Sequence, residues 1–467
     1  MSSEWSLMTL KDAGVSLIDC DHRTPAALDE GYPYIAIPQL KNGHITLDGV
    51  RRISREDYLE WTKKLKPQAN DVIVVRRCNS GQSAYVPAGL DCAIGQNLVV
   101  LRANGEYVLP EFLRWLVQGP DWWGQVSKFI NVGAVFDSLR CRDIPSFELN
   151  IPPREEQTKI AGLLGSLDDR ITLLRETNAT LEAIAQALFK SWFVDFDPVR
   201  AKAEGRARQD GERSGQPRMP QASELPRPGA EAGAEAQGQP EGLDAATAAL
   251  FPDSFEESEL GLVPKGWLLW ALGDAFEINP TRKLKKGDFA PYLDMASVGT
   301  QGHVVDGVVG REMGSGTKFI NGDTLLARIT PCLENGKTAY VDFLDAGQVG
   351  WGSTEFVVLR PKAPLPPYYG YLLARHPAFR DHAIQSMSGT SGRQRIQNDV
   401  LGRYPVAIPT PEVAEAFAGI VQSAQQRIAA NQTQAQTLTQ LRDTLLPRLI
   451  SGQLRLPEAE TQLENAL

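Results

Sequence analysis

Cysteine is scarce in this 467-residue chain, and long apolar runs are missing. The five cysteines are an odd number and include no Cys-x-x-Cys pair, which excludes a disulfide framework and a zinc cage. No apolar run approaches the roughly 18 to 20 residues that cross a membrane. The N-terminal residues have neither the basic nor the apolar segment of a secretory signal. We therefore expect a cytoplasmic protein with no membrane span and no bound metal.

Cofactor motifs are also lacking. Gly336-Lys337-Thr338 imitates the end of a phosphate-binding loop, but Pro331 stands where the first glycine is needed and has no N–H to donate. A turn at Asn335-Gly336 between two strands explains this stretch better. Pro366-Pro367-Tyr368 imitates an amide methyltransferase motif, yet Leu365 replaces its carbonyl-bearing residue. An active site in this chain is therefore not expected.

Negative charge is unevenly distributed along the chain. The formal net charge is -9, and residues 199–260 contain 7 basic and 12 acidic residues, so this stretch alone contributes -5. Residues 199–242 are rich in Ala, Gly, Pro, Glu and Arg and can bury little apolar surface. We predict a disordered linker there, and the remaining charge does not exclude a nucleic-acid partner.

Two long helices are indicated by apolar positions that alternate at intervals of four and three, the pattern of a coiled-coil seam. The second seam repeats the register of the first about 257 residues later, so the two helices can bury each other. From Glu155 to Phe193 a helix would be about 58 Å long. The two seams are Ile160, Leu164, Leu167, Ile171, Leu174, Asn178, Leu181, Ala185, Leu188 and Trp192, and Phe417, Val421, Ala424, Ile428, Asn431, Ala435, Leu438, Arg442, Leu445 and Leu449.

Short β-rich runs before each helix also recur in order: Pro33-Tyr34 returns as Pro291-Tyr292, and Val99-Val100-Leu101-Arg102 returns as Val357-Val358-Leu359-Arg360. We predict an α+β fold in which two tandem α/β segments are separated by two long antiparallel coiled-coil helices, in a pseudo-twofold internal repeat. The predicted boundaries are 1–153 for the first globular segment, 154–198 for the first helix, 199–242 for the linker, 243–411 for a lead-in helix and the second globular segment, 412–452 for the second helix and 453–467 for a tail.

Polar, glycine-rich loops within both globular segments are the candidate site. Arg, Asn and Gln can form paired hydrogen bonds with base edges, and hydroxyl groups suit phosphates. Ordinary solvated loops would look the same from spacing alone. The candidate DNA-binding residues are Arg76, Arg77, Asn79, Gln82, Lys128, Arg328, Asn335, Lys337, Thr390, Ser391, Arg393, Gln394 and Arg395.

Three further stretches resemble the specificity subunit of bacterial type I restriction-modification enzymes. They are Ile151-Pro152-Pro153-Arg154-Glu155-Glu156-Gln157 at the start of the first helix, Leu188-Phe189-Lys190-Ser191-Trp192-Phe193-Val194-Asp195-Phe196 at its end, and Leu441-Arg442-Asp443-Thr444-Leu445-Leu446-Pro447-Arg448-Leu449-Ile450-Ser451-Gly452. The likeness covers nearly the whole chain. Thr410-Pro411 departs from the family's Pro-x-x-Glu-Gln pattern before the second helix.

The resemblance implies a non-catalytic subunit that reads double-stranded DNA. Each globular segment would be a target recognition domain for one half of a split, asymmetric site, and the helices would be a spacer that sets the gap. Two methyltransferase subunits and the restriction and translocase subunits would be the partners, and would hold S-adenosylmethionine, ATP and Mg. We expect excess apolar surface to bind a partner at Leu188, Phe189, Trp192, Phe193, Leu445 and Leu449.

Two other functions remain open: a coiled-coil scaffold without sequence preference, and a single-chain DNA methyltransferase or nuclease, which the missing motifs disfavour. Asn178 and Asn431 interrupt the seam, where polar residues lower stability but fix register. Asn431 could alternatively face a methyltransferase subunit. We expect Asn178→Leu to raise stability and to loosen pairing specificity.

Overall fold

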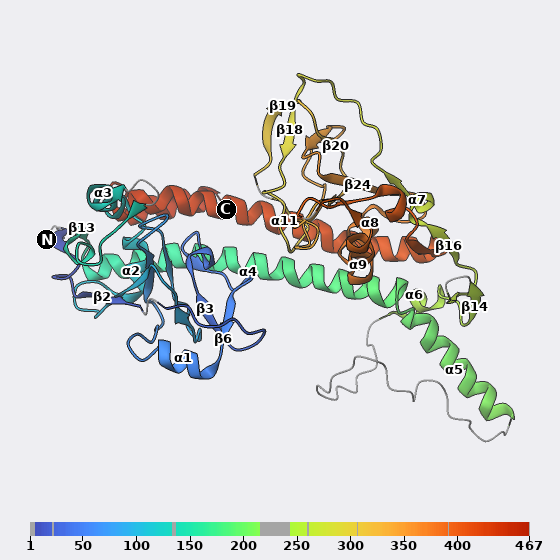
Figure 1. Ribbon diagram of the computed structural model, residues 1–467, viewed down its shortest axis with the longest axis horizontal. Helices are drawn as coiled ribbons and strands as arrows, with labels where there is room; N and C mark the ends of the chain where they lie inside the picture. The colour runs from blue at the N-terminus through green and yellow to red at the C-terminus, as the bar shows by residue number, and fades with distance from the viewer. Residues whose placement is uncertain are drawn as a thin grey trace. The chain divides into compact units, whose positions relative to one another are not determined.

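The computed structural model describes residues 5–20, 23–132, 137–214, 243–258, 261–305, 307–390 and 392–466, and these form two compact units. Unit 1 comprises Met1–Leu173 with Gln434–Leu467, and unit 2 comprises Leu174–Thr433. Helix α4 (Arg154–Phe193) and helix α11 (Pro411–Ile450) each have 40 residues and contribute to both units (Figure 1). Each unit therefore contains one globular segment and one stretch of each long helix.

A four-stranded sheet in the order β2-β10-β7-β8 forms the centre of unit 1, and all its neighbouring strands are antiparallel. Strand β3 pairs with β6 antiparallel and with β9 parallel, and β1 pairs with β13. The strands are β1 (Ser6–Thr9), β2 (Val15–Asp19), β3 (Tyr32–Ile35), β6 (Arg51–Ile53), β7 (Val72–Val75), β8 (Ser83–Tyr85), β9 (Ala93–Ile94), β10 (Leu98–Ala103) and β13 (Glu148–Ile151), with helices α1 (Arg55–Trp61), α2 (Pro110–Leu116) and α3 (Pro120–Phe129).

Unit 2 repeats this topology with a sheet in the order β17-β24-β21-β22. Strand β18 again pairs with one antiparallel strand and one parallel strand, and β16 pairs with β27. Its main elements are β16 (Leu268–Ala271), β17 (Phe276–Ile278), β18 (Phe289–Leu293), β19 (Val309–Glu312), β20 (Thr317–Phe319), β21 (Thr324–Ala327), β22 (Thr338–Tyr340), β23 (Gly350–Gly352), β24 (Phe356–Pro361), α8 (Pro367–Arg375), α9 (Pro377–Gln385) and β27 (Pro405–Ile408). The predicted α+β fold and its tandem repeat are confirmed.

The same ion pair locks the central sheet of both units. Asp71 is buried at the start of β7 and accepts two hydrogen bonds of 2.7 Å from Arg102 on β10. Asp323 takes the same place before β21 and accepts from Arg360, at 2.7 Å, and from Arg282, at 3.1 Å. A buried carboxylate needs such partners because its desolvation is otherwise uncompensated.

In unit 1, α4 and α11 run antiparallel, since Asp168 bonds to Arg442 while Glu156 and Gly452 both lie against Trp5. The predicted seam is buried here, and each buried leucine contributes roughly 1.5 to 3 kcal/mol. Its buried members are Ile160, Leu164, Leu167, Ile171, Ala435, Leu438, Leu445 and Leu449.

In unit 2 the helices are also antiparallel, because Asn178 bonds to Asn431 and the Trp192 ring lies 5.6 Å from that of Phe417. Asn431 Nδ2 donates to Asn178 Oδ1 at 2.8 Å, and Asn178 Nδ2 donates to the carbonyl of Ile428 at 3.3 Å. The alternative in which Asn431 faces another subunit is wrong, because the side chain is buried and its amide bonds within the chain.

The first part of the predicted linker is helical. Residues Asp197–Ser214 form helix α5, so the prediction of disorder is wrong for 199–214, and 215–242 lie outside the described residues. Alanine, arginine, glutamate and glutamine are strong helix formers, and a proline in the first turn is compatible with a helix. The lead-in helix is present as α6 (Ala245–Ala249), capped by Asp244.

Candidate nucleic-acid interface

Three segments of unit 1 meet at one edge of its central sheet: loop 76–82 after β7, the turn before β10, and the hairpin of β11 (Asn131–Val132) and β12 (Asp137–Ser138). The Arg76 backbone joins them, because its N–H donates to the carbonyl of Asn97 at 2.9 Å and its carbonyl accepts from Leu139 N–H at 2.8 Å. Arg77 and Ser138 form an isolated antiparallel β-bridge through their backbones. These backbone bonds therefore hold the start of loop 76–82 against the turn before β10 and against the hairpin.

The Asp137 carboxylate holds the tip of loop 76–82. It accepts hydrogen bonds from the backbone N–H groups of Asn79, at 3.2 Å, and Ser80, at 3.0 Å. Cys78 and Asn79 have positive φ angles of 60° and 69°, a conformation that non-glycine residues seldom adopt. The loop leaves the side chains of Arg77, Asn79 and Gln82 exposed. The sequence reasoning missed Asp137, because nothing in its local sequence distinguishes it from any loop aspartate.

Unit 2 contains the same arrangement. Arg328 N–H donates to the carbonyl of Glu355, and the Arg328 carbonyl accepts from Ile396 N–H, each at 2.9 Å. Loop 328–337, which follows β21, therefore meets a hairpin formed by β25 (Met387–Ser388) and β26 (Arg395–Ile396), and the two form the second loop cluster. Thr330 and Gln394 are joined by two hydrogen bonds, of 3.1 and 3.2 Å. Two loops far apart in sequence thus form one cluster in each unit.

The candidate residues of unit 2 divide into exposed and structural ones. Thr390, Arg393 and Asn335 are exposed, and Gln394 is half-buried. Arg395 instead donates two hydrogen bonds, of 2.9 and 2.6 Å, to Glu355 and thereby lowers the pKa of that carboxyl group.

The remaining candidate residues are two lysines and a serine, and they do not lie together. Lys337 donates to the carbonyl of Met295 at 2.6 Å, which ties down the turn containing Gly336. Lys128 is exposed on α3, and its Nζ lies 5.3 Å from the centre of the Phe129 ring. Ser391 lies outside the described residues. The turn at Gly336 does lie between antiparallel strands, β21 and β22, as predicted.

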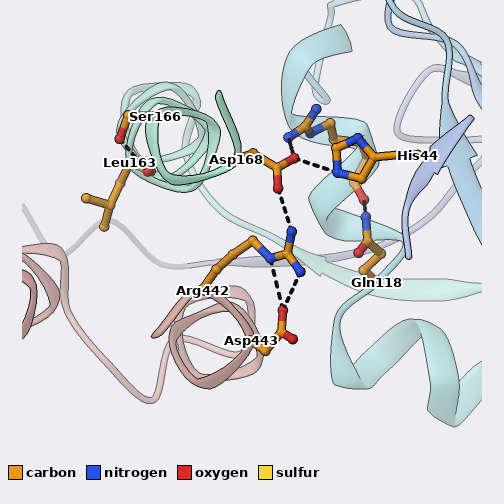
Figure 2. A network of polar contacts seen from close by, with 8 residues as sticks. His44, Gln118, Leu163, Ser166, Asp168, Arg442 and Asp443 are labelled. Atoms are coloured by element: carbon orange, nitrogen blue, oxygen red, sulfur yellow. Dashed lines mark hydrogen bonds and ion pairs between the residues drawn. The ribbon is translucent and has the colours of Figure 1, made fainter. Parts of the chain in front are cut away.

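A buried ionic network joins the first globular segment to both helices within unit 1 (Figure 2). Asp168 on α4 is 4% exposed; it accepts from Arg114 on α2 and from Arg442 on α11, and His44 Nε2 lies 3.1 Å away. Burial would raise the pKa of Asp168, but the hydrogen bond and charge of His44, with Arg114 and Arg442, lower it to about 2. The ionised carboxylate therefore holds α2, α11 and the segment that contains His44 against α4.

Unit 2 joins its globular segment to α4 through a different buried carboxylate. Glu182 accepts from the Tyr371 hydroxyl group at 2.6 Å and from His303 N–H at 3.0 Å. Burial and the adjacent Glu182 raise the pKa of Tyr371 well above its usual value, so its hydroxyl group remains a donor. His303 Nδ1 lies 3.0 Å from the Tyr368 hydroxyl oxygen. Both globular segments are thus fixed to the helix pair by a carboxylate on α4.

Comparison with known proteins points to a single family. The model for the type I restriction modification DNA specificity domain matches residues 3–183. The HindI specificity subunit of Haemophilus influenzae is 28% identical over 405 residues, which cover 81% of this chain and 85% of that protein. The MjaIX specificity subunit of Methanocaldococcus jannaschii is 24% identical over 97% of this chain and 94% of its own length. The chain is similar over most of its length to type I restriction enzyme specificity subunits.

Among solved structures, the S subunit of a type I restriction-modification system from M. genitalium aligns with 96% of this chain and 96% of its own, at 15% identity and a TM-score of 0.47.

The apolar end of α4 is covered by the chain itself. Phe189, Trp192 and Phe193 are buried, and the ring centres of Phe189 and Phe193 lie 4.9 and 5.1 Å from that of Tyr369 on α8. The expectation that these residues face a partner is wrong, because the second globular segment hides them. Leu188 packs against the same core.

Leu445 and Leu449 were also expected at a partner surface, and both are buried in unit 1. They belong to the helix seam and so present no surface to another protein. Across the described parts of the chain, no group of three His, Cys, Asp or Glu residues could hold a metal ion. No described helix is long and apolar enough to cross a membrane.

Proposed function

We propose that this chain is the DNA sequence-recognition subunit of a type I restriction-modification complex, and that each globular segment reads one half of a bipartite, asymmetric site. The observation that carries the proposal is the duplicated loop cluster, which stands at the same edge of equivalent sheets and exposes Arg77, Asn79 and Gln82 in one unit and Thr390 and Arg393 in the other. Arginine, asparagine and glutamine can each form two hydrogen bonds with a base edge. The relatives' names favour DNA specificity over a scaffold without sequence preference.

Other subunits would carry the chemistry in this proposal. Two methyltransferase subunits would bind S-adenosylmethionine, and the restriction and translocase subunits would bind ATP and Mg. This chain would supply rigid recognition loops: Asp137 supports one loop by accepting backbone hydrogen bonds, and Glu355 supports the other by pairing with Arg395. A loop held in this way loses little conformational freedom when it binds DNA. The length of the helix pair would set the gap between the half-sites.

Alanine substitutions in each of the two loop clusters test the proposal directly. We expect Arg77→Ala with Gln82→Ala to change or relax one half of the methylated motif, and Arg393→Ala to affect the other half alone. The measurement is methylome sequencing of cells that express each variant with its methyltransferase subunits. Lys63→Ala, at an exposed position of unit 1 outside the loops, is the control. A motif unchanged in every variant, or one altered in both halves by each variant, would contradict the assignment.

A further inference from the structure

A run of basic residues follows β17 in unit 2. It contains Arg282 together with Lys283, Lys285 and Lys286, and the three lysines are exposed. The equivalent segment of unit 1, residues 20–31 between β2 and β3, has one arginine and three acidic residues. This is a difference in charge between two segments that have the same place in the repeated fold.

A cavity of about 310 Å³ adjoins this run and is lined by three cationic side chains, Arg282, Lys318 and Arg328. The hydroxyl-bearing residues Thr281, Thr317 and Thr354 also line it, and none of its lining residues is acidic. We call this the basic cavity. Guanidinium, ammonium and hydroxyl donors are the groups that bind phosphate oxygens.

The cations of the basic cavity are only partly neutralised. Arg282 shares the single carboxylate of Asp323 with Arg360, and Lys318 donates to the carbonyl of Leu284 at 2.7 Å.

Arg328 donates to the carbonyl of Ile396 at 3.0 Å, and the nearby carboxylate of Glu355 is already paired with Arg395. Among the described residues, the Nε atoms of Arg282 and Arg328 are buried without hydrogen-bond partners. Partly buried positive charge in excess of its carboxylates favours an added anion.

We propose that the basic cavity, with Lys283, Lys285 and Lys286, binds backbone phosphates of duplex DNA, so that unit 2 supplies more sequence-independent affinity than unit 1. This rests on the proposed function. Arg328 belongs both to the cavity and to the second loop cluster, so a phosphate held there would fix the register of the strand against the loops. A chain with a net charge of -9 needs such a local basic site to attract DNA.

The test is the salt dependence of DNA binding by the subunit in complex with its methyltransferase subunits. The variant combines Lys283→Gln, Lys285→Gln and Lys286→Gln, whose exposed positions leave the fold unaffected. Its matched control combines Lys11→Gln, Lys63→Gln and Lys64→Gln, which are exposed lysines of unit 1. Each lost phosphate contact reduces the magnitude of the negative slope of log K against log salt by about 0.9. We expect this magnitude to decrease by about 2 to 3 in the variant and by less than 1 in the control, with the methylated motif unchanged.

The outcomes separate the two proposals. If the wild-type complex binds duplexes specifically and the unit 2 variant keeps its slope, the phosphate site is refuted and the proposed function stands. A wild-type complex that shows no preference among duplexes refutes the proposed function. Inorganic phosphate that binds without DNA, with no change of slope in the variant, would assign the cavity to a free anion and overturn the inference.

Discussion

Replacing Asp168 by asparagine should destabilise unit 1 strongly, because the side chain keeps its shape but loses the charge that two buried arginines need. Arg114 and Arg442 have side chains that are 11% and 13% exposed. Removing one partner of a buried ion pair costs about 3 to 5 kcal/mol. A pKa of about 2, against a usual 3.8, corresponds to only about 2.5 kcal/mol. The larger figure is the better guide, since the pKa reports protonation of Asp168 and not the unpaired arginines left by the substitution.

For a unit of this size, about 3 kcal/mol corresponds to a decrease of about 6 to 12 °C in melting temperature. Calorimetry would measure the transition, and hydrogen exchange followed by mass spectrometry would show whether the lost protection lies in unit 1. Asp169→Asn is the matched control, because Asp169 is exposed on the same helix. If Asp168→Asn melts within 1 °C of this control, the network does not hold the globular segment to the helices and the reasoning is refuted.

Two further predictions concern the helix pair. Asn178→Leu alone should lower stability by about 1 to 3 kcal/mol, because it leaves the buried Asn431 amide without its partner, whereas leucine at both positions should raise stability; denaturant melts of both variants check this. The depressed pKa of Asp168 gives a stability contribution that is complete above about pH 4 and is lost as the pH falls towards 2. Urea melts between pH 7 and pH 2.5 should therefore show a loss of stability below pH 4 that is smaller in Asp168→Asn, and equal losses in both proteins would contradict it.

From the sequence, Asn178→Leu is expected to raise stability, whereas from the structure it is expected to lower stability. The difference arises because the sequence locates each seam asparagine but does not show that the two are hydrogen-bonded to each other. Periodicity places Asn178 and Asn431 in the seam from local sequence alone. Their hydrogen bond depends on the antiparallel register, which is fixed by contacts between positions 253 residues apart. A lone seam asparagine is dispensable for stability, whereas one half of a bonded buried pair is not.

The repeated fold could be predicted because its strand patterns are local in sequence. The hydrogen bonds that support the loops could not be predicted, because they join residues far apart in sequence. Strand patterns such as Val72–Val75 and Leu98–Ala103 are local and recur in both halves. The bonds from Asp137 to loop 76–82 join residues 57 and 58 positions apart, and they exist only once the hairpin has formed. The apolar end of α4 is a further example. Its sequence indicates more apolar surface than the seam can bury, but only the fold shows that Tyr369 and its neighbours cover that surface.

The loops and the docking contacts are built from separate residues, and this separation bears on how such a protein could change its target. Asp168 and Glu182 fix the globular segments to the helices through contacts with α2, α8 and the residues around His44 and His303. The exposed residues of the loop clusters take no part in those contacts. Substitution at a position such as Arg393 therefore removes none of the bonds that fix a globular segment to the helices. The backbone N–H of Arg393 donates within its own loop, to the carbonyl of Thr390. The exposed side chains that we propose read bases can vary at little cost to stability, provided that Asp137 and the pair of Glu355 and Arg395 remain to hold the loops in place.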